Sequence, residues 1–180
     1  DQETADIAVR ASLTGHLVFS TLHTNDAPSA VTRLTDMGIE PYLISSCLEG
    51  VIAQRLVRKI CTACKEEKAP DPSVLEELAS LFPDRIAQAK FSHGRGCPDC
   101  NFTGFRGRVA LFEIMIMNDA IRSMIVRQRP SNEIKHQAVR DGLVTLRRDG
   151  WSRVLEGMTT VEEVMRVAHK TEVSVKVSEE

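Results

Sequence analysis

Several features that would point directly to a function are scarce or absent in this sequence. The 180 residues carry only 4% aromatic side chains and a formal net charge of −2, from 23 Lys and Arg against 25 Asp and Glu. A near-neutral chain has no general electrostatic attraction for nucleic acid, and its basic clusters lack interleaved aromatic residues that would stack on bases. The apolar runs are short, as where Glu113 interrupts VALFEIMIM, and none approaches the roughly 20 residues of a membrane span. The sequence therefore predicts neither nucleic-acid binding nor a transmembrane segment.

No export signal can be read at the start of the sequence either. The opening DQETAD enters a helical pattern at once, without the basic and apolar segments of a signal peptide, which predicts a cytoplasmic protein. We also expect that a further segment of the same protein precedes Asp1.

Cysteine, by contrast, is well represented, and four of the five cysteines form two CxxC pairs. Cys61 and Cys64 make the first pair, and Cys97 and Cys100 make the second. In a chain without an export signal this spacing indicates a metal site more than disulfides, because zinc prefers four thiolates in a tetrahedron. Four sulfur ligands leave no position for water, so the predicted zinc is structural. Disulfides or unliganded thiols stay open as alternatives, and Cys47 is interpreted as a buried apolar residue.

Apolar periodicity predicts an α/β segment at the start of the chain. Residues 3–15 are typical of a helix that ends at Gly15, and the uncharged run 16–21 indicates a strand covered on both faces, as in a parallel sheet. A second helix should end at Gly38. Apolar spacings of three and four then predict one long helix over 42–59.

The composition changes at Lys59, where a polar segment with two prolines begins. We expect one helix at 73–81 in this segment, followed by a Gly-rich stretch with little core. The sequence then predicts a strand from Arg108 and a small helical domain. Its expected helices cover 119–127, 131–141, 145–156 and a last one that begins at the capping residue Thr160, before a polar tail at 171–180.

His23 is the histidine that we single out for function. It follows the predicted strand at its carboxyl end, where open α/β sheets bind ligands, and Thr24 and Asn25 add polar groups there. His16 lies at the other end of the strand. Because a strand rises about 3.3 Å per residue, His16 and His23 are too far apart to share one small ligand. A lone histidine at a strand end is otherwise more often structural, and that interpretation stays open.

Three stretches of the sequence resemble the secretion ATPase superfamily. DQETADIAVRASLTGHLVFSTLHTNDA is similar to the end of its magnesium-binding acidic motif and to its histidine box. EGVIAQRLVRKICTACK and CPDCNFTGFRGRVALFEI resemble the tetracysteine insert of the type II secretion and type IV pilus assembly branches, and DGLVTLRRDGWSRVLEGMTTVEEVMRVA continues the likeness. The resemblance covers nearly the whole chain. It implies an α/β fold class, namely the C-terminal part of a RecA-like P-loop ATPase domain with a zinc-binding tetracysteine insert and a small helical C-terminal domain.

The resemblance also implies an arrangement of domains, partners and site residues. The expected domains are 1–58 for the ATPase core, 59–107 for the insert and 108–180 for the C-terminal strand and helices. The intact protein would be a homo-hexamer that uses ATP and magnesium and that lies at the inner membrane through a platform protein and cytoplasmic-face components. The implied site residues are catalytic His23, His16, Asp1 and Glu3, nucleotide-side Thr24 and Asn25, and zinc ligands Cys61, Cys64, Cys97 and Cys100. Within this set His23 would sense the γ-phosphate, and His16 would orient the turn at Gly15 or a subunit contact.

The phosphate-binding motif GxxxxGK[ST] occurs nowhere in the 180 residues. Because its lysine and backbone amides hold the β- and γ-phosphates, we predict that the chain alone does not hydrolyse ATP. The tetracysteine insert favours secretion or filament extension over retraction. The alternative is a free-standing, zinc-clasped interaction module without an ATPase role, which the CxxC pairs and the missing motif would permit.

Overall fold

The computed structural model describes residues 1–168 and divides them into two compact units. Unit 1 comprises 1–53 and 113–144, and unit 2 comprises 54–112 and 145–168. Each unit is therefore built from two separate stretches of the chain. None of the helices in the described part is long and apolar enough to cross a membrane.

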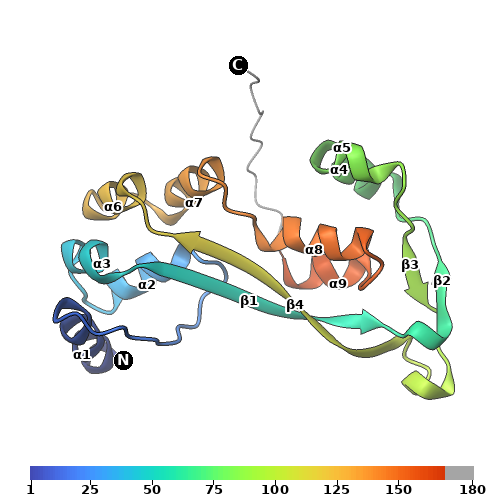
Figure 1. Ribbon diagram of the computed structural model, residues 1–180, viewed down its shortest axis with the longest axis horizontal. Helices are drawn as coiled ribbons and strands as arrows, with labels where there is room; N and C mark the ends of the chain where they lie inside the picture. Colours follow the sequence, from blue (N-terminus) through green and yellow to red (C-terminus); the bar gives the residue numbers. More distant parts are fainter. Residues whose placement is uncertain (169–180) are drawn as a thin grey trace. The chain divides into compact units, whose positions relative to one another are not determined.

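Figure 1 shows two long strands, and each of them has residues in both units. Strands β1 (Gly50–Ile60) and β4 (Phe105–Ile116) pair with each other in a two-stranded sheet, and the unit boundaries fall inside both strands. The compact units thus cut the chain differently from the sequence-based division into 1–58, 59–107 and 108–180, which stays a prediction.

Unit 1 is helical apart from its share of the two strands. Its helices are α1 (Gln2–Leu13), α2 (Ser29–Asp36), α3 (Pro41–Cys47), α6 (Asp119–Val126) and α7 (Ser131–Arg140). Helix α1 begins after Asp1, whose side chain accepts a hydrogen bond from the Thr4 N–H. Gly15 and Gly38 follow α1 and α2 with positive φ angles of 92° and 89°, which an L-residue rarely adopts. Both predicted helix ends are confirmed.

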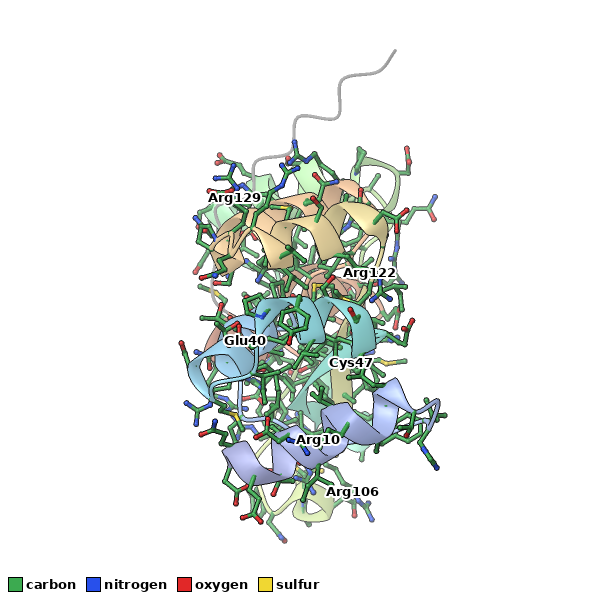
Figure 2. All side chains as sticks on the ribbon, turned by 90° about the vertical axis from the view of Figure 1, so that its left-hand side faces the viewer. Arg10, Glu40, Cys47, Arg106, Arg122 and Arg129 are labelled. Atoms are coloured by element: carbon green, nitrogen blue, oxygen red, sulfur yellow. The ribbon has the colours of Figure 1, made fainter. Side chains whose placement is uncertain are left out.

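The helices of unit 1 contact one another in series. Helix α3 contacts α1 and α6, and α6 contacts α7. Figure 2 shows this order, with Arg10 on α1, Cys47 at the end of α3 and Arg122 on α6. The side chains of Ile44 on α3 and Ile121 on α6 are fully buried, so burial of apolar surface between the helices holds the unit together.

The predicted long helix over 42–59 is wrong. Helix α3 is short, and strand β1 follows it after a two-residue break. Burial along β1 has a period of two: Ala53 and Val57 are buried, whereas Ile52 and Leu56 are exposed. The same apolar pairs fit a helical stripe equally well in the sequence, and the β-branched residues and the pairing with β4 decide for the strand.

The strand predicted at 16–21 does not form. These residues belong to no helix or strand and are exposed, with Leu17 and Phe19 at 79% and 87% exposure. Within the described residues the sheets are β1 with β4 and β2 with β3, and neither includes this segment. A strand needs a hydrogen-bonded neighbour for its N–H and C=O groups, so the apolar composition alone does not create one.

Unit 2 combines a small two-stranded sheet with helices. Its elements beside β1 and β4 are η1 (Thr62–Cys64), β2 (Lys65–Glu67), α4 (Pro72–Leu81), α5 (Pro83–Ile86), β3 (Ser92–Gly94), η2 (Pro98–Cys100), α8 (Leu146–Leu155) and α9 (Val161–Val167). Trp151 of α8 is fully buried and donates from Nε1 to Glu77 of α4 at 2.9 Å. Arg147 binds the same carboxylate through Nε and Nη2, at 2.6 and 2.7 Å. An added Cβ on Gly150 would lie 2.6 Å from Val164, so α8 and α9 approach closely there.

Glu163 on α9 ties that helix to β1. Its carboxylate is 2% exposed and accepts hydrogen bonds from the Arg58 N–H at 2.8 Å, from the Arg58 guanidinium and from Arg166. Burial opposes its ionisation, but the hydrogen bonds from Arg166 and Arg58 outweigh burial and lower the pKa of Glu163 to about 2. Thr160 caps α9 by accepting the Glu163 N–H, as predicted.

The helices predicted after Lys59 are confirmed, whereas the short helix α5 was not predicted. Helices α4, α6, α7 and α8 lie within one or two residues of the predicted bounds, and β4 covers the predicted strand apart from Met117. The predicted polar tail at 171–180 lies outside the described residues.

Candidate functional site

The two CxxC pairs meet in one compact cluster in unit 2. The four Sγ atoms of Cys61, Cys64, Cys97 and Cys100 lie within 4.8 Å of one another, and none forms a disulfide. Cys61 lies 3.9 Å from Cys97, Cys64 lies 3.9 Å from Cys100, and Cys97 lies 3.8 Å from Cys100. A tetrahedral zinc with Zn–S bonds of about 2.3 Å needs sulfur atoms roughly 3.8 Å apart. The four thiols therefore have the spacing of a closed tetrathiolate centre.

Two tight turns bring the sulfur atoms together. Each CxxC pair ends in a single 3₁₀ turn, and the second turn is followed by Asn101 in the left-handed conformation, with φ of 49°. Gly94 and Gly104 approach so closely that a Cβ on Gly94 would collide with the backbone of Gly104. Strands β2 and β3 pair antiparallel, with Lys65 opposite Gly94, directly beside the cluster. The glycines that the sequence places around the second pair are thus required by backbone contacts.

Backbone N–H groups point at the sulfur atoms. The Gly96 N–H donates to Cys64 Sγ at 3.3 Å, and the N–H groups of Cys97 and Gly104 donate to Cys100 Sγ at 3.2 and 3.3 Å. Burial opposes ionisation of Cys100, but these two donors outweigh burial and lower its pKa to about 6. Burial raises the pKa of Cys64. The backbone N–H groups therefore favour the ionised form of Cys100, which is the form that binds a metal.

The histidine-box loop, which we define as residues 16–28, lies in unit 1. His23 is exposed, and Thr24 Oγ1 donates to the backbone oxygen of Asp26 at 3.1 Å. His16 Nδ1 lies 3.0 Å from Thr14 Oγ1 and 3.3 Å from the Ala11 carbonyl oxygen. His16 thus contacts the turn that ends α1.

The predicted acidic residues Asp1 and Glu3 lie at the beginning of α1. Asp1 is the N-cap of this helix, and Glu3 lies in its first turn, where carboxylates favour the positive end of the helix dipole. Within residues 1–168, no hydrogen bond or ion pair joins them to His16 or His23. Within residues 1–168, the structure thus brings the four predicted zinc ligands together, but it does not bring the four residues predicted to be catalytic together.

A buried ionic cluster in unit 1 was missed by the sequence reasoning. Lys135 of α7 donates to Asp26 Oδ2 at 2.7 Å and lies 3.8 Å from Glu113 Oε2 of β4. Glu113 Oε1 accepts the Ala27 N–H at 2.9 Å, and Asp26 Oδ1 accepts the Ser29 N–H at 3.1 Å and the Ser29 hydroxyl. Burial opposes ionisation of Asp26, but the hydrogen bonds from Lys135 and Ser29 lower its pKa. We call Asp26, Lys135 and Glu113 the ionic triad.

The sequence does contain a signal for this triad. Glu113 lies on the same face of β4 as Leu111 and Met115, which are fully buried. A carboxylate in phase with the core face of a strand is buried rather than a break in an apolar run, and it needs a partner. The partner lies on a helix 22 residues further along, and nothing in the sequence identifies it as Lys135.

The protein combines a mixed α/β architecture with a cluster of four cysteines. Comparison with known proteins shows to which family these features belong. The family model described as T2SSE, Type II/IV secretion system protein, matches residues 1–166. The chain therefore belongs to the type II/IV secretion system protein family, and the family predicted from the sequence motifs is confirmed.

Relatives from both branches of the family are similar along almost the whole chain. The type IV pilus assembly ATPase PilB of Thermus thermophilus is 50% identical over 165 residues, which are 92% of this chain and 18% of that protein. The type II secretion system protein E of Pseudomonas aeruginosa is 50% identical over 170 residues, 94% of this chain and 33% of that protein. The chain thus spans a third or less of the length of these two relatives.

A solved structure supports the fold class. The crystal structure of the pilus retraction motor PilT with bound ADP matches with a TM-score of 0.60 and 26% sequence identity, over 94% of this chain and 37% of that one. The predicted α/β fold class of the secretion ATPases is confirmed.

Proposed function

We propose that this chain is the C-terminal part of a cytoplasmic, hexameric ATPase that powers type II protein secretion or type IV pilus assembly. One observation carries the proposal: more than nine-tenths of the chain is 50% identical both to a pilus assembly ATPase and to a type II secretion protein. The ATPase would act with ATP and magnesium and would reach the inner membrane through its platform and other cytoplasmic-face partners. The phosphate-binding loop would lie outside these 180 residues, so the chain alone would not hydrolyse ATP.

The histidine-box loop would complete the nucleotide site of that ATPase. Exposed apolar side chains at Leu17 and Phe19 support the idea that residues 16–21 become a strand when a neighbouring strand of the same protein pairs with them. His23 would then lie at the end of that strand and bind the γ-phosphate or the attacking water. Asp1 and Glu3 would lie toward the magnesium, and Thr24 and Asn25 toward the nucleotide.

The cysteine cluster would hold one structural zinc. The closed set of four sulfur ligands and the backbone N–H groups that donate to the sulfur atoms support this assignment. Bound zinc would fix the two turns and the short sheet of β2 and β3 beside them, which have little apolar core of their own. The presence of a tetracysteine insert would favour a motor for secretion or filament extension over a motor for retraction.

The experiment that tests the function is an ATPase assay of the longer polypeptide that includes the phosphate-binding loop. Replacing His23 with Ala should lower kcat by about 100-fold or more, because removal of a group in contact with the reacting atoms costs that much. The affinity for ATP should change by less than about threefold, because the bound ground state keeps its other contacts. His136→Ala, at an exposed histidine of α7, is the matched control and should keep the activity of the unaltered protein. A His23→Ala enzyme with unchanged kcat would contradict the proposal.

A further inference from the structure

The ionic triad joins three segments that are far apart in the sequence. Asp26 lies in the histidine-box loop, Glu113 on β4 and Lys135 on α7. The contacts that connect the loop to these elements span 86 and 109 residues of chain. All three charged side chains lie within unit 1, so the triad is a link inside one compact body.

The loop supplies part of the charge compensation of the triad. Two carboxylates face one ammonium group, and their side chains are 22%, 1% and 10% exposed for Asp26, Glu113 and Lys135. The remaining negative charge is compensated by N–H groups at the beginning of α2, from Ala27 and Ser29. Since a buried carboxylate without donors is strongly disfavoured, the triad fixes the backbone at these residues.

The fixed part of the loop begins immediately after His23. Ala27 is completely buried, and the Thr24 hydroxyl is bonded to the Asp26 carbonyl oxygen. By contrast, residues 16–23 are exposed throughout. His23 therefore lies between an exposed segment and a segment that the ionic triad holds in place. The triad thereby determines the position of the backbone next to His23.

We propose that Glu113 and Lys135 are positioning residues, which hold the histidine-box loop so that His23, Thr24 and Asn25 face the nucleotide. The inference rests on the proposed function of this loop. It adds to that function a second set of residues, on β4 and α7, that act on the reaction without touching the nucleotide. Because a displacement of about 1 Å in a reacting group costs up to about 100-fold in rate, loss of the anchor should act mainly on kcat.

The first test measures positioning on the 180-residue chain, without any ATPase assay. Hydrogen exchange of the Ala27 amide, followed by NMR, reports directly on its bond to Glu113. Glu113→Gln keeps an oxygen acceptor at the same place and should leave the exchange rate within about threefold, whereas Glu113→Leu removes the acceptor and should raise it by about tenfold or more. If Glu113→Leu does not fold, Lys135→Met serves instead and should also raise the exchange rate. Equal exchange in the unaltered and Glu113→Leu chains would overturn the proposal.

The second test compares the same variants in the longer polypeptide that hydrolyses ATP. Glu113→Leu should lower kcat by about 10-fold to 100-fold with KM for ATP within about threefold, and Glu113→Gln should restore most of kcat. Arg147→Met is the control for general destabilisation, because it breaks a buried ion pair in unit 2 and should keep kcat. An unchanged kcat in Glu113→Leu, or an equal loss in Arg147→Met, would overturn the positioning role. A longer polypeptide without ATPase activity would refute the proposed function instead, while the exchange test would still decide whether the triad anchors the loop.

Discussion

Replacement of Glu163 by Gln should destabilise unit 2 by an amount that depends on pH. The pKa of this carboxyl falls from 4.5 to about 2. At about 1.4 kcal/mol per pKa unit, this sets an upper limit of about 3 kcal/mol for the contribution of the charge to the free energy of unfolding. The side chains of Arg58 and Arg166 are more than half exposed, so solvent screening reduces the expected loss to about 1 to 2 kcal/mol at neutral pH.

The direction of the pH dependence follows from the lowered pKa. A carboxyl with a depressed folded-state pKa stabilises the protein above its unfolded-state pKa, and this contribution disappears as pH falls through the folded-state value. The difference in stability between the unaltered chain and the Glu163→Gln variant should therefore be complete above about pH 6, less than half as large at about pH 3 and almost absent at about pH 2.

A single tryptophan makes the assay specific to unit 2. Trp151 is the only tryptophan of the sequence and is fully buried in α8, so its fluorescence reports unfolding of this unit. Urea unfolding curves of both chains, recorded at several pH values, give the difference in free energy directly. Glu76→Gln, at an exposed glutamate of α4, is the matched control and should change stability by no more than about 0.5 kcal/mol. A Glu163→Gln effect that is the same at pH 7 and pH 3 would refute the reasoning.

Two further predictions concern unit 2. Elemental analysis of the reduced protein should find one zinc per chain, absent from Cys61→Ser and Cys97→Ser but retained in Cys47→Ser, whose thiol lies outside the cluster. A metal-free protein with five titratable thiols would rule the zinc out. Gly150→Ala should destabilise unit 2 by about 1 kcal/mol, because crowding against Val164 exceeds the gain in helix propensity. In the same fluorescence assay, combining Gly150→Ala with Val164→Ala should recover part of the crowding cost. Additive losses of stability in the double variant would contradict the close contact.

Local signals in the sequence predicted much of the fold. Helix ends at Gly15 and Gly38, the cap at Thr160 and the spacing of the CxxC pairs each depend on interactions within a few residues, and each is found in the structure. The cysteine cluster was predictable because metal ligands impose both a residue type and a spacing.

The incorrect predictions depend on partners that are distant in the sequence. Strand β1 has apolar pairs that fit two periodicities, and only its pairing with β4 selects the strand. The run 16–21 has the composition of a buried strand but lacks a hydrogen-bonded neighbour within the described residues. Glu113 could be recognised as buried from its phase in the strand, but its partner Lys135 belongs to a helix, and sequence alone does not match one charge to another across such a separation.

The way in which β1 and β4 pass through both units has a practical consequence for dissecting the protein. The chain crosses from one unit to the other three times, and two of these crossings lie in the middle of hydrogen-bonded strands rather than in linkers. Limited proteolysis at loops should therefore nick the chain without releasing either unit as a separate fragment, because a protease requires locally unfolded backbone. To obtain one unit alone, both of its stretches would have to be rejoined through a new turn, as in a circular permutant. Truncation at a single residue would leave one stretch of a unit without the other and expose its apolar residues.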